Sequence, residues 1–138
     1  MLKLNPIIFI IFTLLLNSCS SSNKSVDIRL HDIWALDSIE GEKIIIDNAI
    51  ANLPVLEIFV EDERVHGNTS CNTMNGQVKI DNNQIAFLNI ITTKMACPGD
   101  IENRFLSALQ KVNNYKILKL KLYLYEDDKE LLSLKKID

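Results

Sequence analysis

The distribution of apolar residues after position 32 is the feature that most constrains the fold. Apolar residues there occur in short runs rich in β-branched and aromatic side chains, and each run ends at turn-forming or charged residues. Runs of this length suit strands and are too short for most helices. The segments expected to form strands are 33–39, 43–46, 55–60, 64–66, 77–80, 84–88 with its extension 90–93, 118–125 and 131–134. The sequence therefore predicts about seven or eight strands.

Turn-forming residues divide the middle of this pattern. The stretch from Gly67 to Gly76 is rich in Gly, Asn, Thr and Ser, and we expect it to be a loop. Within it, Asn75-Gly76 is the strongest local turn signal, because both residues tolerate the positive φ of a type I′ turn. The three residues 81–83, Asp-Asn-Asn, are expected to join the two arms of a hairpin.

One segment has helical instead of strand periodicity. Its apolar residues recur at the spacing of a single helical stripe: Ile101, Phe105, Ala108, Leu109 and Val112. Asp100 is expected to cap the first turn, after Pro98-Gly99 has ended the preceding segment. Asn113-Asn114 is the expected C-terminal stop, so we predict one helix over about 101–112.

The segment after the helix alternates strictly between apolar and polar or aromatic residues. This alternation predicts one strand that places four leucines on a single face: Leu118, Leu120, Leu122 and Leu124. The predicted fold class is α+β, mostly antiparallel β, with a curled sheet or cracked barrel packed against one α-helix. With 138 residues and 47% apolar content, the chain can bury one core and is not disordered.

The N-terminus has the pattern of a targeting signal. Lys3 precedes an apolar run from Ile7 to Leu16, which is too short to span a bilayer and suits a signal-peptide core. The tetrapeptide 16–19, Leu-Asn-Ser-Cys, resembles a bacterial lipoprotein signal, with acylation expected at Cys19. We therefore expect a signal peptide at 1–18, a flexible tether at 19–31 and one domain at 32–138.

The residue after Cys19 also bears on the location of the protein. Ser20 is not the Asp that marks inner-membrane retention, so the resemblance implies the outer membrane, with the domain on its periplasmic face. Removal of the leader takes away Lys3 and no acidic residue, which makes the mature chain more acidic than the −3 of the full sequence. This overall balance favours neither nucleic acid nor an anionic membrane surface as a partner.

With Cys19 acylated, Cys71 and Cys97 remain as an even pair in an oxidising compartment. They can form a disulfide, pack as two buried thiols, or present a reactive thiol. A papain-like site would need Cys71, His66 and Asn72 to converge, which their proximity in the sequence does not establish. His31 and His66 lack metal-ligand spacing, and neither a metal nor a cofactor is expected.

Several landmarks recur in an order that resembles the META domain family, which contains HslJ-like bacterial lipoproteins. They are Trp34, expected in the core, followed by Gly67, Cys71, Asn72, Gly76, Thr93, Met95, Ala96 and Cys97, and then by Glu102 and Phe105 of the helix. The family usually has Gly where this chain has Ser70. If that position requires positive φ, Ser costs about 1 kcal/mol there.

The resemblance implies a β-rich domain linked to envelope or heat stress and drug tolerance, and it brings no catalytic residues. We therefore expect a non-enzymatic lipoprotein that binds an envelope protein or an apolar ligand. The alternatives are a pilotin-like chaperone for lipid or a client protein, which needs an open apolar groove, and a thiol-dependent enzyme. A packed space between sheet and helix would favour binding through the outer surface.

Overall fold

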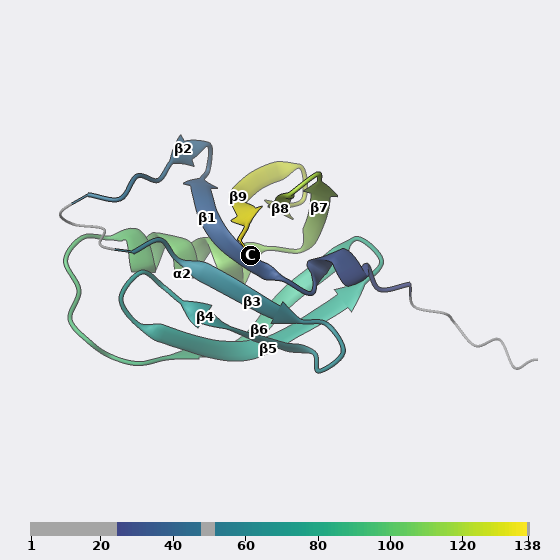
Figure 1. Ribbon diagram of the computed structural model, residues 1–138, viewed down its shortest axis with the longest axis horizontal. Coiled ribbons are helices and arrows are strands. Elements are labelled where there is room, and N and C mark those ends of the chain that lie inside the picture. Colours follow the sequence, from purple (N-terminus) through teal and green to yellow (C-terminus); the bar gives the residue numbers. More distant parts are fainter. Residues whose placement is uncertain (1–24, 48–51, 138) are drawn as a thin grey trace, which may run out of the picture.

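The structure of the protein is a computed structural model, and it describes residues 25–47 and 52–137 (Figure 1). The predicted signal peptide and Cys19 lie outside the described residues. The elements in chain order are η2 (Ile28–Leu30), β1 (Ile33–Ile39), β2 (Glu42–Lys43), β3 (Val55–Phe59), β4 (Arg64–Asn68), β5 (Thr73–Asp81), β6 (Gln84–Thr92), α2 (Ile101–Lys111), β7 (Asn114–Leu118), β8 (Lys121–Glu126) and β9 (Lys129–Lys136).

The described strands form one antiparallel sheet that closes on itself. Its order is β2-β1-β3-β4-β5-β6-β7-β8-β9, and β1 pairs in addition with β9. The ring is uneven, because β6 and β7 share only the pair Gln84↔Asn114. The sheet is therefore a curled ring and not a regular barrel (Figure 1). This architecture confirms the predicted fold class of a curled, mostly antiparallel sheet with one α-helix.

Side chains fill the space between the sheet and α2. The helix packs against β1, β6 and β9, and it directs Ile101, Phe105, Ala108 and Leu109 inward. Phe105 and Leu109 are fully buried and belong to the same apolar cluster as the inner face of the ring. As predicted, Trp34 is in this core.

The folded domain begins earlier than the sequence suggested. Residues 28–30 form the 3-10 helix η2, and Leu30 is completely buried. The indole Nε1 of Trp34 donates a hydrogen bond to the Leu30 carbonyl at 3.1 Å. The end of the predicted tether at 19–31 is therefore part of the core, since burying Leu30 completes the environment of the Trp34 ring.

The predicted turn at Asn75-Gly76 is wrong, because both residues lie inside β5. Gly76 sits where the register between β5 and β6 shifts, and a Cβ atom built there would lie 2.4 Å from Cδ1 of Ile90. The glycine thus allows close approach of a neighbouring strand, which local sequence cannot distinguish from a turn. The predicted loop from Gly67 to Gly76 shrinks to residues 69–72, because pairing extends β4 and β5 into it.

The predicted strand with four aligned leucines is also wrong. It is interrupted by a two-residue turn at Lys119-Leu120, where Lys119 has φ 55°. Leu118 and Leu120 are 50% and 66% exposed, whereas Leu122 and Leu124 are fully buried. The alternation of apolar and polar residues continues through this turn. The sequence pattern therefore predicted one strand where the structure has the two strands of a hairpin.

Smaller differences concern two segment ends. The predicted strand 43–46 reduces to the two-residue strand β2, which pairs only with the end of β1. Asp100 occupies the N-cap position of α2, but its side chain makes no capping hydrogen bond. The predicted hairpin of β5 and β6 and the predicted helix are both present.

Gly67 lies where β3 and β4 approach most closely. A Cβ atom at Gly67 would lie 1.9 Å from the Val55 carbonyl oxygen, which belongs to the backbone of the paired strand. We predict that Gly67→Ala lowers the free energy of unfolding by about 3 kcal/mol, measured by urea denaturation. Gly76→Ala should cost less, because its nearest contact is the end of a flexible side chain. Equal costs at the two positions would contradict this account of the close approach.

Asp37 links the first strand to the last two. Its carboxylate lies 2.8 Å from Nζ of Lys135 in β9 and 3.1 Å from Nζ of Lys121 in β8. The hydrogen bond from Lys135, with that from Lys121, lowers the pKa of Asp37 despite opposing desolvation. A lowered folded-state pKa stabilises the fold above the unfolded pKa, and this contribution disappears as the pH falls through the folded value.

We therefore predict that Asp37→Asn lowers the free energy of unfolding by about 1 kcal/mol at pH 7. The difference from the wild type should shrink as the pH falls below 3.8, the ordinary pKa of an aspartate, and through the lowered pKa of the folded state. Urea denaturation across this pH range measures both effects. Asp62→Asn is the matched control, because Asp62 is exposed and lies 3.8 Å from Arg64. A cost for Asp37→Asn that does not change with pH would refute the ion-pair explanation.

Candidate functional site

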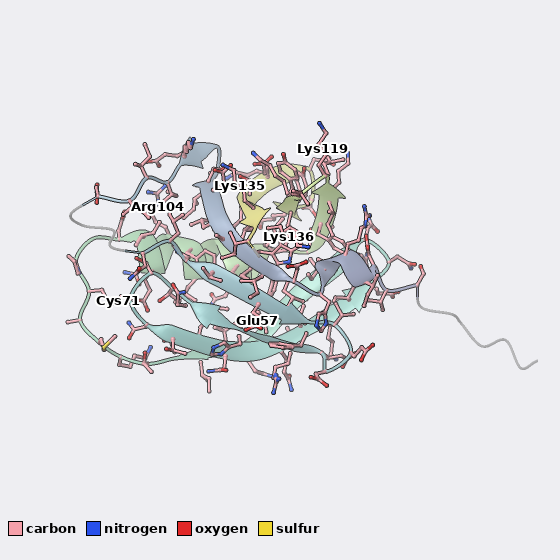
Figure 2. All side chains as sticks on the ribbon, viewed as in Figure 1. Glu57, Cys71, Arg104, Lys119, Lys135 and Lys136 are labelled. Carbon is pink, nitrogen blue, oxygen red and sulfur yellow. A yellow bond between two sulfur atoms is a disulfide. The ribbon has the colours of Figure 1, made fainter. Side chains whose placement is uncertain are left out.

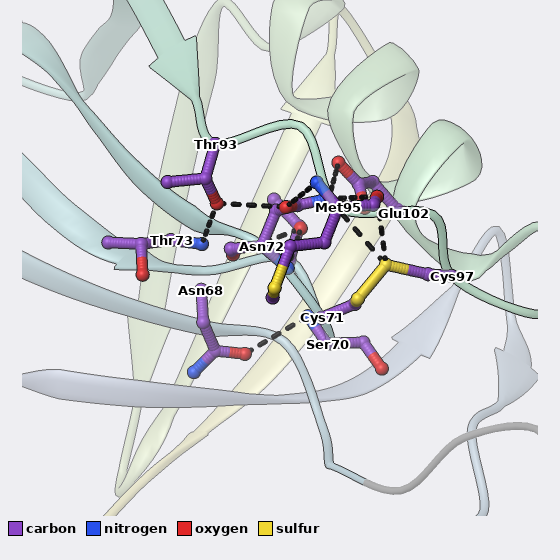
Figure 3. The surroundings of a disulfide bond; sticks show 10 residues. Asn68, Ser70, Cys71, Asn72, Thr73, Thr93, Met95, Cys97 and Glu102 are labelled. Carbon is purple, nitrogen blue, oxygen red and sulfur yellow. Dashed lines mark hydrogen bonds between the residues drawn. A yellow bond between two sulfur atoms is a disulfide. The ribbon is translucent and has the colours of Figure 1, made fainter.

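Two loops meet at one end of the ring and form the candidate site (Figure 3). The first loop, residues 69–72, joins β4 to β5, and the second segment, residues 93–99, joins β6 to α2. The first loop is a tight turn in which the Thr69 amide donates to the Asn72 carbonyl at 2.8 Å. The hydroxyl of Thr69, which is fully buried, bonds within the same turn. Local hydrogen bonds within residues 69–72 therefore hold this loop in shape in addition to its contacts with the second segment.

A disulfide joins the two segments. Cys71 and Cys97 are bonded, with their Cα atoms 6.1 Å apart and a sequence separation of 26 residues. The sequence left open a bond, two buried thiols or a reactive thiol, and the structure has the bond. In the chain-entropy model, a loop of this length stabilises the folded state by about 3.5 kcal/mol.

The side chain of Asn72 is the polar centre of the site. Its Oδ1 accepts hydrogen bonds from the Thr93 hydroxyl and from the Met95 amide, both at 2.8 Å. Its Nδ2 donates to the Met95 carbonyl at 3.1 Å and to Oε2 of Glu102 at 2.9 Å. Asn72 is 2% exposed, so these bonds replace those it would make to water. One buried amide thus connects the first loop, the second segment and the first turn of α2.

These contacts leave an apolar surface exposed on residues 93–99, which we call the loop surface. Met95 is 60% exposed, and Ala96 and Pro98 are exposed beside it. A surface cavity of about 640 Å³ lies next to them and is lined by both loops and by the start of α2. Methionine adapts its shape to different partners. The arrangement is therefore suited to binding on a rigid support.

The predicted motif residues divide into two groups. The structure brings together Cys71, Asn72, Thr93, Met95 and Cys97 at the site (Figure 3). Trp34, Gly67 and Gly76 act elsewhere, in the core and at close contacts between strands, while Ala96 is exposed on the loop surface.

Glu102 is one of the landmark residues of the helix, but the sequence did not predict its role at the site. Its carboxylate accepts both hydrogen bonds that the Asn72 amide group donates to the helix. The only sequence signal was its position in the first turn after Cys97, where an acidic residue is favourable with or without this contact.

The residues considered for catalysis and metal binding do not converge. Nδ1 of His66 lies 2.8 Å from Oδ1 of Asn75, while Cys71 is bonded to Cys97 and Asn72 faces Met95 and Glu102. The papain-like arrangement is therefore not formed. His31 contacts the Phe59 ring edge-on, at 5.8 Å between centroids.

The described residues also lack two further features. Within residues 25–47 and 52–137, no group of three or more His, Cys, Asp or Glu side chains is placed to hold a metal ion. Over the same residues, no helix has the length and apolar character needed to cross a bilayer.

Replacement of Asn72 tests its role as the polar centre. We predict that Asn72→Ala lowers the free energy of unfolding by about 2–3 kcal/mol, because buried partners lose their hydrogen bonds. Hydrogen exchange at the Met95 amide should become faster in the variant. Asn75→Ala is the control, since Asn75 is exposed. Equal effects of the two substitutions would show that Asn72 does not brace the loops.

Ser70, where the sequence resemblance led us to expect glycine, has a φ of 90°. A side chain is strained in this conformation, and glycine is not. We predict that Ser70→Gly raises the free energy of unfolding by about 1 kcal/mol, measured by urea denaturation. Ser70→Ala keeps the Cβ atom and should leave stability nearly unchanged. Equal stabilisation by both variants would exclude backbone strain as the cause.

Comparisons with known proteins agree with this geometry. The META domain family model matches residues 27–138. A search of curated proteins finds no match. A protein from Burkholderia xenovorans solved by NMR is 18% identical with a TM-score of 0.62, covering 88% of this chain and 97% of its own. A crystal structure of a DUF4847 family protein from Bacteroides vulgatus is 17% identical with a TM-score of 0.59, covering 79% and 96%.

Another NMR structure is 22% identical with a TM-score of 0.62, covering 81% of this chain and 96% of its own. At these identities the structural likeness shows a shared fold. The family match spans nearly all of the described residues, including both loops of the site. This chain belongs to the META domain family.

Proposed function

We propose that the protein is a non-enzymatic lipoprotein, anchored through Cys19 on the periplasmic face of the bacterial outer membrane. Its domain contributes to envelope or heat stress and drug tolerance by binding an envelope protein at the loop surface. The observation that carries this proposal is the exposed apolar segment around Met95, held rigid by a disulfide and a buried amide. An oxidising compartment is where such a disulfide persists.

The chemistry of the site supports binding more than catalysis. Both sulfur atoms are committed to the disulfide, and both ends of the Asn72 amide are committed to bracing the loops. The side chains that project from this framework include Met95 and Pro98, which offer apolar contact area, with the exposed Lys94 beside them. A partner protein can use such a surface as an anchor point.

The filled interior favours a protein partner over an apolar ligand. Fully buried side chains, including Phe105 and Leu109, occupy the space between α2 and the ring. A pilotin-like chaperone for lipid or client remains the alternative, and it would require α2 to move aside to open a groove. Co-purification of one stoichiometric apolar molecule with the full chain would favour that alternative.

Metabolic labelling with palmitate tests the anchor in a bacterial host expressing the full chain. We expect the wild type to incorporate the label and to fractionate with the outer membrane. Cys19→Ala should abolish both, because it removes the acylated thiol. The matched control, Cys71→Ser with Cys97→Ser, should keep the label, since these cysteines lie in the domain. An unlabelled wild type, or a labelled Cys19→Ala variant, would refute the proposed anchor.

Site-specific photo-crosslinking tests the binding surface in the same cells. A photoreactive residue replaces Met95 on the loop surface or, as the control, Lys79, which is exposed on β5. We expect a discrete crosslinked protein from position 95 alone, and we expect Cys97→Ser to reduce it by releasing the loop. The same products from both positions, or none from position 95, would contradict binding at the loop surface.

A further inference from the structure

The hairpin of β7 and β8 exposes apolar residues that the core does not use. Leu118 and Leu120 are 50% and 66% exposed, and they flank Lys119 at the turn. The outward side of β7 also carries Lys116, which is exposed and lies opposite Tyr123 in the register with β8. We call these five residues the β7–β8 tip. It combines aliphatic, aromatic and cationic side chains on one projecting feature.

The charge of the tip is not balanced locally. Residues 103–125 include five basic residues and no acidic one, although the whole chain has a net charge of −3. Two other lysines nearby, Lys121 of β8 and Lys135 of β9, are already paired with Asp37. Neither Lys116 nor Lys119 forms an ion pair with any residue in 25–47 or 52–137. Their two positive charges therefore face solvent beside exposed leucines.

The position and the side chains of the tip suit contact with a lipid surface. It is the turn of a hairpin, and Figure 2 shows Lys119 projecting outward from the molecule. Aliphatic side chains beside lysines can enter the boundary between headgroups and acyl chains while the ammonium groups contact lipid phosphates. Tyrosine is enriched at the same boundary. The chemistry of the tip therefore complements a leaflet that contains anionic phospholipid.

The start of the described chain lies close to one residue of this tip, Lys116. A surface cavity is lined by residues 25–27 and Arg29 and, from β7, by residues 115–117, which include Lys116. The one acidic residue in this lining, Asp27, is paired with Arg29. The segment that leads to the proposed anchor therefore joins the domain beside Lys116. Figure 2 shows Cys71 at the lower left edge of the molecule and Lys119 at its top, well apart from each other. A domain that rests on its tip would thus keep the loop surface accessible.

We propose that the β7–β8 tip docks the domain on the anionic phospholipid leaflet that holds the anchor. The inference rests on the proposed anchor and adds an orientation to it. The leucines enter the interfacial region, and Lys116 and Lys119 pair with lipid phosphates. Each lysine near an anionic surface strengthens such binding about fivefold, and the effect is screened by salt.

Fluorescence quenching by brominated lipid tests the docking with the full chain reconstituted in vesicles. Leu120→Trp places a reporter at the tip, and the single native tryptophan, Trp34, is 1% exposed and provides a constant background. Ile91→Trp is the matched control, because Ile91 is 69% exposed on β6. Vesicles contain brominated phosphatidylcholine alone or with brominated phosphatidylglycerol. Flotation of the vesicles measures anchoring in the same samples.

We expect the reporter at position 120 to be quenched at least about twofold more than the control when phosphatidylglycerol is present. High salt should reduce the difference, as should Lys116→Gln combined with Lys119→Asn, in which asparagine tolerates the positive φ of the turn. Flotation without extra quenching at position 120 would overturn the docking alone. Equal quenching of both reporters would also overturn it, and a protein that does not float would contradict the anchor and the docking together.

Discussion

The pairing of the first strand of the ring with the last is the constraint on which the rest of the structure depends. β1 lies between β3 and β9, and the register with β9 runs from Trp34↔Lys136 to Ile39↔Leu132. This pairing removes two free sheet edges and encloses the inner apolar face. The weak point lies at β6 and β7, which share one residue pair. Because α2 packs against β6, β9 and β1, it contributes the apolar side chains that complete the core.

A filled ring leaves its outer surface and its two ends for function. At one end, the disulfide and the Asn72 amide hold an apolar segment in a fixed position at little entropic cost to binding. Away from this site, the β7–β8 tip carries exposed leucines and two lysines that form no ion pair within the part of the chain that the structure describes. Separating the two features would allow one molecule to contact a leaflet and a partner at the same time.

Features set by local sequence were predictable, and features set by contacts between distant strands were not. The stripe from Ile101 to Leu109 and the Asn-rich turn at 82–83 each carry their signal within a few residues. The sequence predicted a turn at Gly76, but the structure uses this glycine to let β5 pack closely against Ile90. That contact depends on a strand more than ten positions away in the sequence. The sequence identified Asn72 as a motif residue, yet only the fold shows that its amide reaches Met95 and Glu102.

The most direct test of the central claim is the oxidation state of Cys71 and Cys97 in the full chain isolated from the cell envelope. The protein is denatured without reductant, treated with an alkylating reagent and digested, and its peptides are identified by mass spectrometry. The account predicts one pair of peptides linked through these two cysteines and no alkylation of either sulfur. Complete alkylation of both sulfurs would contradict it, since neither the braced loop surface nor an oxidising location would then be supported.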